Sequence, residues 1–173
     1  GIDTKSPQDT IPFHPYYTAK DAFGLGVFII FFSVFIFYIP DFLGHPDNYI
    51  EADRLKTPAH IVPEWYYLPF YAILRAIPDK LLGIVAMFGS IMILFAMPWL
   101  DGARIRSMRF RPLSKFFFWI FVVNGLFLGY LGQISPDDIL AFGWTALTYA
   151  QIATFYYFAY FLVVMPLVSR MET

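Results

Sequence analysis

Residues 81–100 read LLGIVAMFGSIMILFAMPWL, twenty residues without a charged side chain. A helix of this length rises about 30 Å, which matches the hydrocarbon core of a bilayer. Three further long uncharged runs occur at 22–39, 116–132 and 139–168. The last run is longer than one crossing needs and starts with small and polar residues, so we place its span at 149–168. The sequence therefore predicts an all-α integral membrane protein with four transmembrane helices in a single membrane domain over 1–173.

The composition agrees with a lipid environment. Of the 173 residues, 58% are apolar and 14% are charged, whereas about a quarter of an average soluble domain is charged. The net charge of −1 argues against nucleic acid as a partner. The chain has no cysteine, which excludes disulfides, thiol catalysis, iron–sulfur ligation and covalent haem attachment within it. Because the chain starts with glycine, and its first apolar run is too long for a signal peptide, we expect a processed product or a fragment.

The distribution of basic residues predicts the orientation of the chain. Lysine and arginine concentrate in short loops on the cytoplasmic or matrix side, here called the negative side. With four crossings, 1–21, 101–115 and 169–173 share one side and hold eight basic residues, while 40–80 and 133–148 share the other side and hold four. We therefore expect both termini on the negative side and the loop 40–80 on the positive side.

The loop 40–80 is longer than most loops, and such loops tend to be functional or to carry structure of their own. It contains the motif PEWY at 63–66, and the stretch 65–77 is almost wholly apolar but too short to cross a bilayer. We expect a short interfacial helix there. Pro69 must lie at a kink or in the first turn of this helix, because it has no N–H and clashes in a helix interior.

Glu64 is the candidate functional residue of this loop. It is flanked by Pro63, Trp65 and Tyr66, with further aromatic rings up to Tyr71. A carboxylate in such surroundings is poorly solvated, which suits it to accept and release protons. It could equally be an acid at a helix start that faces water. The rings could form flat walls for a ring-shaped ligand or an interfacial aromatic belt.

A second candidate site lies at the start of the first span. Lys20 and Asp21 could be anchors that reach the interface, or a negative-side proton site with Asp21 as donor and Lys20 as relay. The three histidines, His14, His45 and His60, are in predicted loops, whereas a haem inside a bundle needs histidines on facing helices. The sequence holds no recognisable metal-site motif.

Several segments together resemble a known family. They are IPFHPYYTAKD at 11–21, LGHPDNYIEADRLKTPAHIV at 43–62, PEWY with its continuation YLPFYAILRAIP up to 78, and MPWLDGARIRSMRFRP at 97–112. Together and in this order they resemble the C-terminal half of cytochrome b from respiratory cytochrome bc complexes, of the alphaproteobacterial and mitochondrial type. The resemblance implies a core subunit of a quinol:cytochrome c oxidoreductase coupled to proton translocation, with ubiquinol and ubiquinone as substrates.

The resemblance also implies roles for individual residues of the PEWY loop. Glu64 is similar to the carboxylate that hydrogen-bonds quinol and takes a proton towards the positive side. Tyr71 is similar to the tyrosine of the same site, while Pro63, Trp65 and Tyr66 are similar to the motif residues that shape it.

On the negative side, the resemblance implies a quinone-reduction site. Asp21 and Lys20 are similar to residues of that site, with Phe13 as the ring that packs against the quinone. The histidines that hold the two b haems of this family belong to its N-terminal half and have no equivalent here. The implied partners are therefore that haem-bearing half, a Rieske iron–sulfur protein, a c-type cytochrome and membrane lipid, in a dimeric complex of the bacterial inner or mitochondrial inner membrane. Alone, the chain should be inactive.

Two alternatives remain open at this point. Subunit IV of cytochrome b6f-type complexes also carries PEWY but has three spans, so the span at 149–168 and the HPDNY sequence favour the respiratory type. A non-catalytic membrane scaffold or a transporter subunit is the other alternative. Transporters usually place ionisable residues near the bilayer midplane, and the predicted spans contain none.

Overall fold

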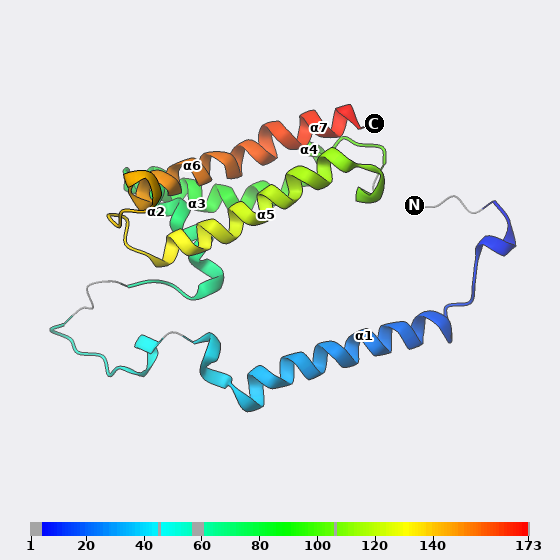
Figure 1. The fold of residues 1–173 in the computed structure, drawn as a ribbon, viewed down its shortest axis with the longest axis horizontal. Coiled ribbons are helices and arrows are strands. Elements are labelled where there is room, and N and C mark those ends of the chain that lie inside the picture. Colours follow the sequence, from blue (N-terminus) through cyan, green and yellow to red (C-terminus); the bar gives the residue numbers. More distant parts are fainter. Residues whose placement is uncertain (1–4, 45, 57–60, 106, 173) are drawn as a thin grey trace. The chain divides into compact units, whose positions relative to one another are not determined.

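Each of the four uncharged runs contains a long helical stretch in the computed structural model, which describes residues 5–44, 46–56, 61–105 and 107–172. The chain divides into two units, Gly1–Leu55 and Lys56–Thr173 (Figure 1). The assignment of 1–173 to a single membrane domain stays a prediction.

The first unit is built around α1, Tyr16–Ser33, which continues through a π-helical turn, Val34–Tyr38. Pro15 precedes this helix and Pro40 follows it. Proline has no backbone N–H to donate to a helix carbonyl oxygen, so it is well placed just outside a helix. None of the residues of α1 is buried within the structure as described. A helix that is apolar on all sides and has no cover of its own is typical of a membrane span. Short 3-10 turns, Pro7–Asp9, Pro40–Leu43 and Pro46–Tyr49, flank it.

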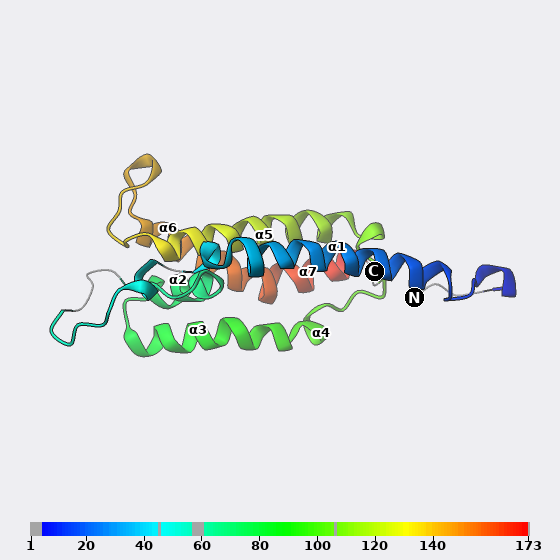
Figure 2. The same cartoon turned by 90° about the horizontal axis from the view of Figure 1, so that it is seen from below.

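The second unit is a helical bundle. Its α-helices are α2, Leu68–Ala76; α3, Lys80–Phe95; α4, Met97–Leu100; α5, Pro112–Gln133; α6, Ala146–Ala159; and α7, Met165–Met171. A π-helical turn, Tyr160–Val164, joins α6 to α7, so the two run on as one helix (Figure 2). Short 3-10 turns lie at Trp65–Tyr67, Met108–Phe110 and Ala141–Gly143. The fold is all-α, as predicted.

Among the residues that the structure describes, three helical stretches are long and apolar enough to cross a membrane: Tyr16–Tyr38, Pro112–Gln133 and Ala146–Met171. The run at 81–100 gives a shorter helix, because α3 ends at Phe95 and α4 follows after Ala96. Pro98 lies in the first turn of α4, where the missing N–H is tolerated, and it accounts for the break. The number of crossings therefore stays a prediction, whereas the helical membrane fold is confirmed.

The core of the second unit lies where α2, α5 and α6 meet. It is made of small and aliphatic residues together with aromatic rings: Ala72, Ile73, Ala76, Leu128, Leu131, Ala146, Ala150, Ala153, Tyr157, Tyr160 and Phe161. The alanines recur every three or four residues on α6 and let its backbone approach its neighbours. Phe121 of α5 stacks on Tyr160 with ring centroids 4.5 Å apart. These contacts hold α5 and the last helix together along their length.

A buried ion-pair network closes one end of the second unit. Arg111 is 3% exposed and donates to both carboxylate oxygens of Asp101, at 2.9 and 2.8 Å. Its Nε lies 3.7 Å from Glu172, which also accepts hydrogen bonds from the backbone N–H groups of Leu113 and Ser114 at 2.6 and 3.1 Å. The network therefore joins the segment after α4, the start of α5 and the end of α7.

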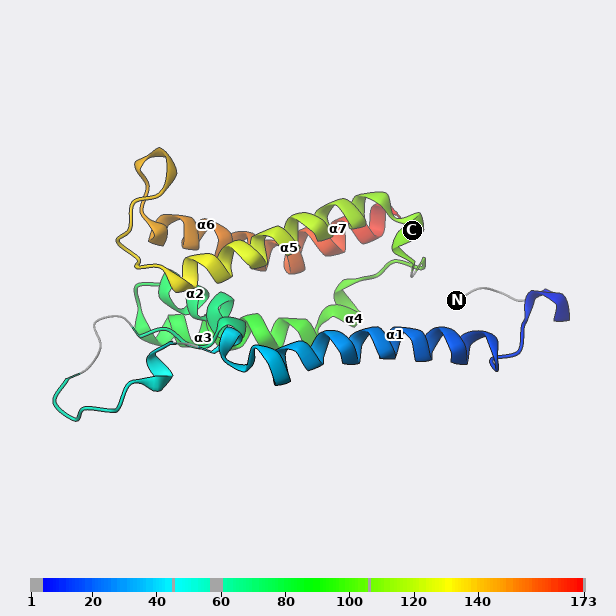
Figure 3. The same cartoon turned by 60° about the horizontal axis from the view of Figure 1, so that its bottom comes forward.

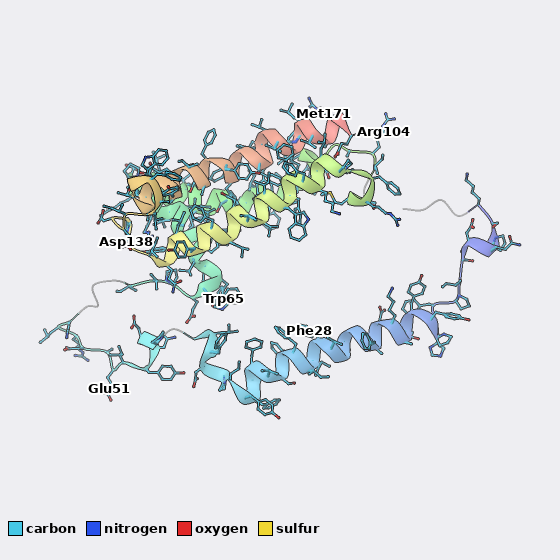
Figure 4. The ribbon with its side chains drawn as sticks, viewed as in Figure 1. Phe28, Glu51, Trp65, Arg104, Asp138 and Met171 are labelled. Atoms are coloured by element: carbon cyan, nitrogen blue, oxygen red, sulfur yellow. The ribbon has the colours of Figure 1, made fainter. Side chains whose placement is uncertain are left out.

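The two ends of the second unit carry different loops. Arg104 and Met171 lie at one end, and Trp65 and Asp138 lie at the other (Figure 4). The PEWY loop and the loop after α5 thus share one end, as alternate crossings of a bilayer require. Which end faces the positive side stays a prediction.

Candidate functional site

The PEWY motif forms the entrance to α2. Glu64 is extended, with φ −57° and ψ 152°, and its carbonyl oxygen accepts a hydrogen bond from the Tyr67 N–H at 2.9 Å. The 3-10 turn Trp65–Tyr67 follows, and α2 then begins at Leu68. Pro69 lies in the first turn of α2, one of the two positions predicted for it. Because Pro69 cannot donate to the Trp65 carbonyl oxygen, Leu68 donates to it instead, which tightens the turn.

The short α2 is held between helices by backbone contact. It contacts α3, α5 and α6, and in Figure 3 it lies beside α3 and the end of α5. A Cβ added to Gly83 of α3 would lie 2.6 Å from the Leu74 carbonyl oxygen, and one added to Gly132 of α5 would meet the Leu68 carbonyl oxygen. Only glycine permits such close approach. The helix that follows PEWY is therefore clamped at both of its ends.

Polar contacts reinforce this clamp. The guanidinium of Arg75, in the last turn of α2, donates to the carbonyl oxygens of Leu131 and Ile134 at 2.7 and 2.9 Å. These oxygens lie at the C-terminal end of α5, where helix carbonyls have no partner within the helix. In return, the side-chain amide of Gln151 on α6 donates to the Ala76 carbonyl oxygen at 3.1 Å. The end of α2 is thus tied to both α5 and α6.

Tyr71 connects this anchored helix to the segment before PEWY. The Arg75 guanidinium carbon lies 4.9 Å from the centroid of the Tyr71 ring, a cation–π contact that fixes the ring. The Tyr71 hydroxyl donates to the Ile61 carbonyl oxygen at 3.5 Å, the long limit of a hydrogen bond. The ring is half-buried, so the position of Tyr71 is set mainly by its stack on Arg75.

An exposed aromatic surface adjoins Glu64. The side chains of Trp65, Tyr66 and Tyr67 are 58%, 52% and 54% exposed, while Pro63 and Glu64 are half-buried. The Trp65 and Tyr66 rings meet edge to face at 5.6 Å between centroids, and those of Tyr66 and Tyr67 lie 4.6 Å apart. An exposed apolar patch of this kind is typical of a binding surface. The structure therefore brings the predicted PEWY residues together as a carboxylate beside flat rings.

The other predicted residues, Phe13, Lys20 and Asp21, belong to the first unit. The Phe13 ring stacks on Tyr17, with centroids 6.2 Å apart and 11° between planes. Lys20 and Asp21 are exposed in the second turn of α1. All three thus lie on or just before the start of α1, and their role stays a prediction.

The described residues do not fit a haem. His14 Nδ1 lies 3.0 Å from Thr18 Oγ1 just before α1, while His45 and His60 lie outside the described residues. Within the described ranges, no three His, Cys, Asp or Glu side chains come together as metal ligands. A haem held in a bundle needs histidines on facing helices, and the described helices of this chain carry none.

Comparison with known proteins places the chain in a family. Residues 51–158 match the family model described as cytochrome b(C-terminal)/b6/petD, which covers more than half of the chain. The chain belongs to this family. PEWY, α2 and most of the bundle of the second unit all fall within the matched residues.

Its relatives are cytochromes b. The chain is 58% identical to cytochrome b of Rhodospirillum rubrum over 172 residues, which are 99% of this chain and 41% of that protein. It is 54% identical to the cytochrome b/c1 of Bradyrhizobium diazoefficiens, covering 100% of this chain and 24% of that protein. A chain from the structure of a hyperthermophilic respiratory complex III matches with a TM-score of 0.85 and 34% identity, over 99% of this chain and 42% of that chain. The chain thus spans about two fifths of its cytochrome b relatives and corresponds to their C-terminal part.

Sequence reasoning missed the residues that hold the site. The sequence pattern identified Arg75 only as one of the basic residues of the loop 40–80. It did not identify Gln151 or Gly132 as candidate residues. Gly125 and Gly129 of α5 form a GxxxG pattern, which is typical of close helix packing. However, a Cβ on Gly125 would meet nothing within 4 Å, whereas one on Gly129 would lie 3.7 Å from the Pro69 ring. The tight contact belongs to Gly132, one helical turn further on.

Proposed function

We propose that this chain is the part of cytochrome b that supplies one wall of the quinol-oxidation site in a quinol:cytochrome c oxidoreductase. One observation carries the proposal: a carboxylate, Glu64, opens a helix that is clamped by α3, α5 and α6 and bordered by exposed aromatic rings. A flat, partly polar quinol head fits between such rings. The cytochrome b relatives and the complex III neighbour support this reading over a cytochrome b6f subunit or a scaffold.

In this proposal Glu64 accepts a proton from a quinol hydroxyl and passes it to water on the positive side. Tyr71, Trp65 and Tyr66 form the wall that positions the ring. Pro63 has a fixed φ and restricts the residue before it, so the backbone that leads into Glu64 is stiff. Holding the acceptor on a rigid element fixes the distance over which the proton moves. The clamp on α2 therefore serves the chemistry directly.

The electrons leave to groups outside this chain. Oxidation of a quinol to a quinone releases two electrons. In this proposal one electron would pass to the b haems of the N-terminal half of cytochrome b, and the other would pass to a Rieske iron–sulfur protein and from it to a c-type cytochrome. Those groups supply one-electron chemistry when they are present. The part played by this chain is to bind and orient the quinol and to take one of its two protons, through Glu64, towards the positive side.

We further propose that Phe13, Lys20 and Asp21 contribute to a quinone-reduction site on the negative side. Asp21 would give a proton to the reduced quinone, Lys20 would fix or relay it, and Phe13, already stacked on Tyr17, would extend an aromatic wall to the quinone ring. Both termini would then lie on the negative side of a bacterial or mitochondrial inner membrane.

Replacing Glu64 by Gln in the assembled complex tests the oxidation site. The variant keeps the shape of the side chain and loses the proton acceptor, so we expect quinol:cytochrome c turnover to fall about tenfold or more and to lose its dependence on pH. Glu51→Gln, which removes an exposed acid from the same loop, is the matched control and should leave turnover unchanged. Unchanged turnover across pH in Glu64→Gln would exclude the proposed role.

Replacing Asp21 by Asn tests the reduction site. We expect slower reoxidation of the b haems by quinone, while their reduction by quinol at the other site keeps its normal rate. Flash-induced haem absorbance changes separate the two steps in one preparation. Normal reoxidation would show that Asp21 is an interfacial anchor rather than a proton donor.

A further inference from the structure

A groove of about 370 Å³ opens at the start of α5. This end of the second unit is the one that carries Arg104, away from Trp65 (Figure 4). The groove combines two basic side chains with three apolar ones: Arg109, Lys115, Met108, Phe118 and Trp119. Neither the proposed quinol site nor the ion-pair network around Arg111 uses any of these side chains.

The groove has a cationic end and an apolar end. Lys115, Phe118 and Trp119 are spaced three and four residues apart, so they lie along one face of α5. Trp119 lies about 6 Å further along the helix axis than Lys115. Arg109, in the 3-10 turn before the helix, adds the second charge beyond Lys115. The charges therefore lie at the loop end of a candidate span and the rings lie further towards its middle.

The two charges are uncompensated. Two acidic residues lie near Arg109 and Lys115: Asp101, the nearest acid in the sequence, and Glu172, at the end of the last helix. Both form ion pairs with Arg111. Glu172 also accepts a hydrogen bond from a backbone N–H at the start of α5. The side chains of Arg109 and Lys115 make no hydrogen bond or ion pair within the part of the chain that the structure describes. Two free cations beside a groove make a site for an anion.

We infer that this groove binds the headgroup of an anionic phospholipid, with its phosphate between Arg109 and Lys115 and its acyl chain along Phe118 and Trp119. Basic side chains next to a span attract anionic lipids, and guanidinium and ammonium groups bind phosphate through charge-assisted hydrogen bonds. This inference does not depend on the proposed quinol chemistry.

The apolar end of the groove favours a lipid over a soluble anion. Phe118 and Trp119 are 41% and 57% exposed, and a free phosphate would leave both rings uncovered. An acyl chain covers them, and a tryptophan at this depth of a span is typical of the membrane interface. α5 is itself long and apolar enough to cross a bilayer, and in this inference lipid borders its exposed face.

The test compares lipid binding by the purified complex and its variants. The Arg109→Gln, Lys115→Gln double variant removes both cations and keeps the rings. After detergent exchange, native mass spectrometry with added phosphatidylglycerol measures the affinity. We expect a loss of about tenfold or more, because each basic residue near an anionic lipid contributes roughly a factor of five. The matched control, Arg104→Gln with Arg170→Gln, removes two exposed charges from the same end outside the groove and should bind like the parent.

Four outcomes would overturn the inference. Equal losses in the double variant and the control would show an effect of net charge alone. Equal binding of phosphatidylglycerol and phosphatidylcholine, or displacement of the lipid by millimolar inorganic phosphate, would exclude an anionic lipid site. A photo-crosslinker at residue 119 that captures another polypeptide instead of phospholipid in native membranes would show a protein interface. If the double variant does not assemble, Lys115→Gln alone gives the same comparison with a loss of about fivefold.

Discussion

Gly132 of α5 lies directly against the carbonyl group of Leu68, the first residue of α2. The contact is between backbones, so no side chain separates the third predicted span from the helix that follows PEWY. Leu68 is only four residues from Glu64 along a 3-10 turn. A change at Gly132 is therefore transmitted to the candidate proton acceptor through a short, stiff stretch of chain.

Replacing Gly132 by Ala should displace α2. The added Cβ would overlap the Leu68 carbonyl group, and overpacking of this kind typically costs about 1–3 kcal/mol. We expect a lower thermal midpoint of the assembled complex and slower quinol oxidation. Gly125→Ala is the control on the same helix, because its Cβ would meet nothing within 4 Å and alanine favours the helix. Equal behaviour of the two variants would show that the contact does not position α2.

The helices were predictable from the sequence because long uncharged runs have few alternatives to a membrane span. Their ends were less predictable. The uncharged run at 116–132 begins after Lys115, whereas α5 already starts at Pro112. Proline is well placed in the first turn of a helix, and the long side chain of Lys115 can reach the interface. The span placed at 149–168 begins at Ala146, because Thr145 caps the helix by accepting from the Thr148 N–H at 3.4 Å.

The contacts that clamp α2 could not be predicted from the sequence. Arg75 donates to carbonyl oxygens 56 and 59 residues away, and Gln151 donates to one 75 residues away. Such pairs follow from packing, which hydropathy and local motifs do not encode. The residues of PEWY itself were predictable from a motif and from the resemblance it supports. Their anchoring, which makes the motif rigid, was visible only in the folded chain.

The ion-pair network should make stability depend on acid pH. The guanidinium of Arg111 lowers the pKa of Asp101 below its usual range. Burial raises the pKa of Glu172, but hydrogen bonds from Ser114 and from the N–H groups of Leu113 and Ser114 outweigh it and lower the pKa overall. Carboxylates with lowered pKa values stabilise the fold above their unfolded pKa of about 4, and this stability is lost as the pH falls through the folded values.

Asp101→Asn tests this dependence. At neutral pH the variant should unfold at a lower temperature, because Arg111 is left buried with a weakened partner. The difference from the parent should shrink as the pH falls below about 4, where the parent loses the same charge. Thermal unfolding of the complex in a pH series measures both, with the exposed Asp137→Asn as control. A difference that stays constant with pH would show that the charge of Asp101 does not contribute.

Two adjacent tyrosines of α6 should differ in what their hydroxyls contribute. The Tyr157 hydroxyl donates to the Ser90 carbonyl oxygen of α3 at 2.8 Å, whereas the buried Tyr156 hydroxyl has no hydrogen-bond partner within the described residues. Tyr157→Phe should cost about 0.5–1.5 kcal/mol, the usual value of such a bond between helices. Tyr156→Phe should be neutral or stabilising, because it removes an unsatisfied polar group. The thermal midpoints of unfolding of the two variants test this prediction. Equal decreases in the midpoint would mean that the hydrogen bond to Ser90 does not hold α3 against α6.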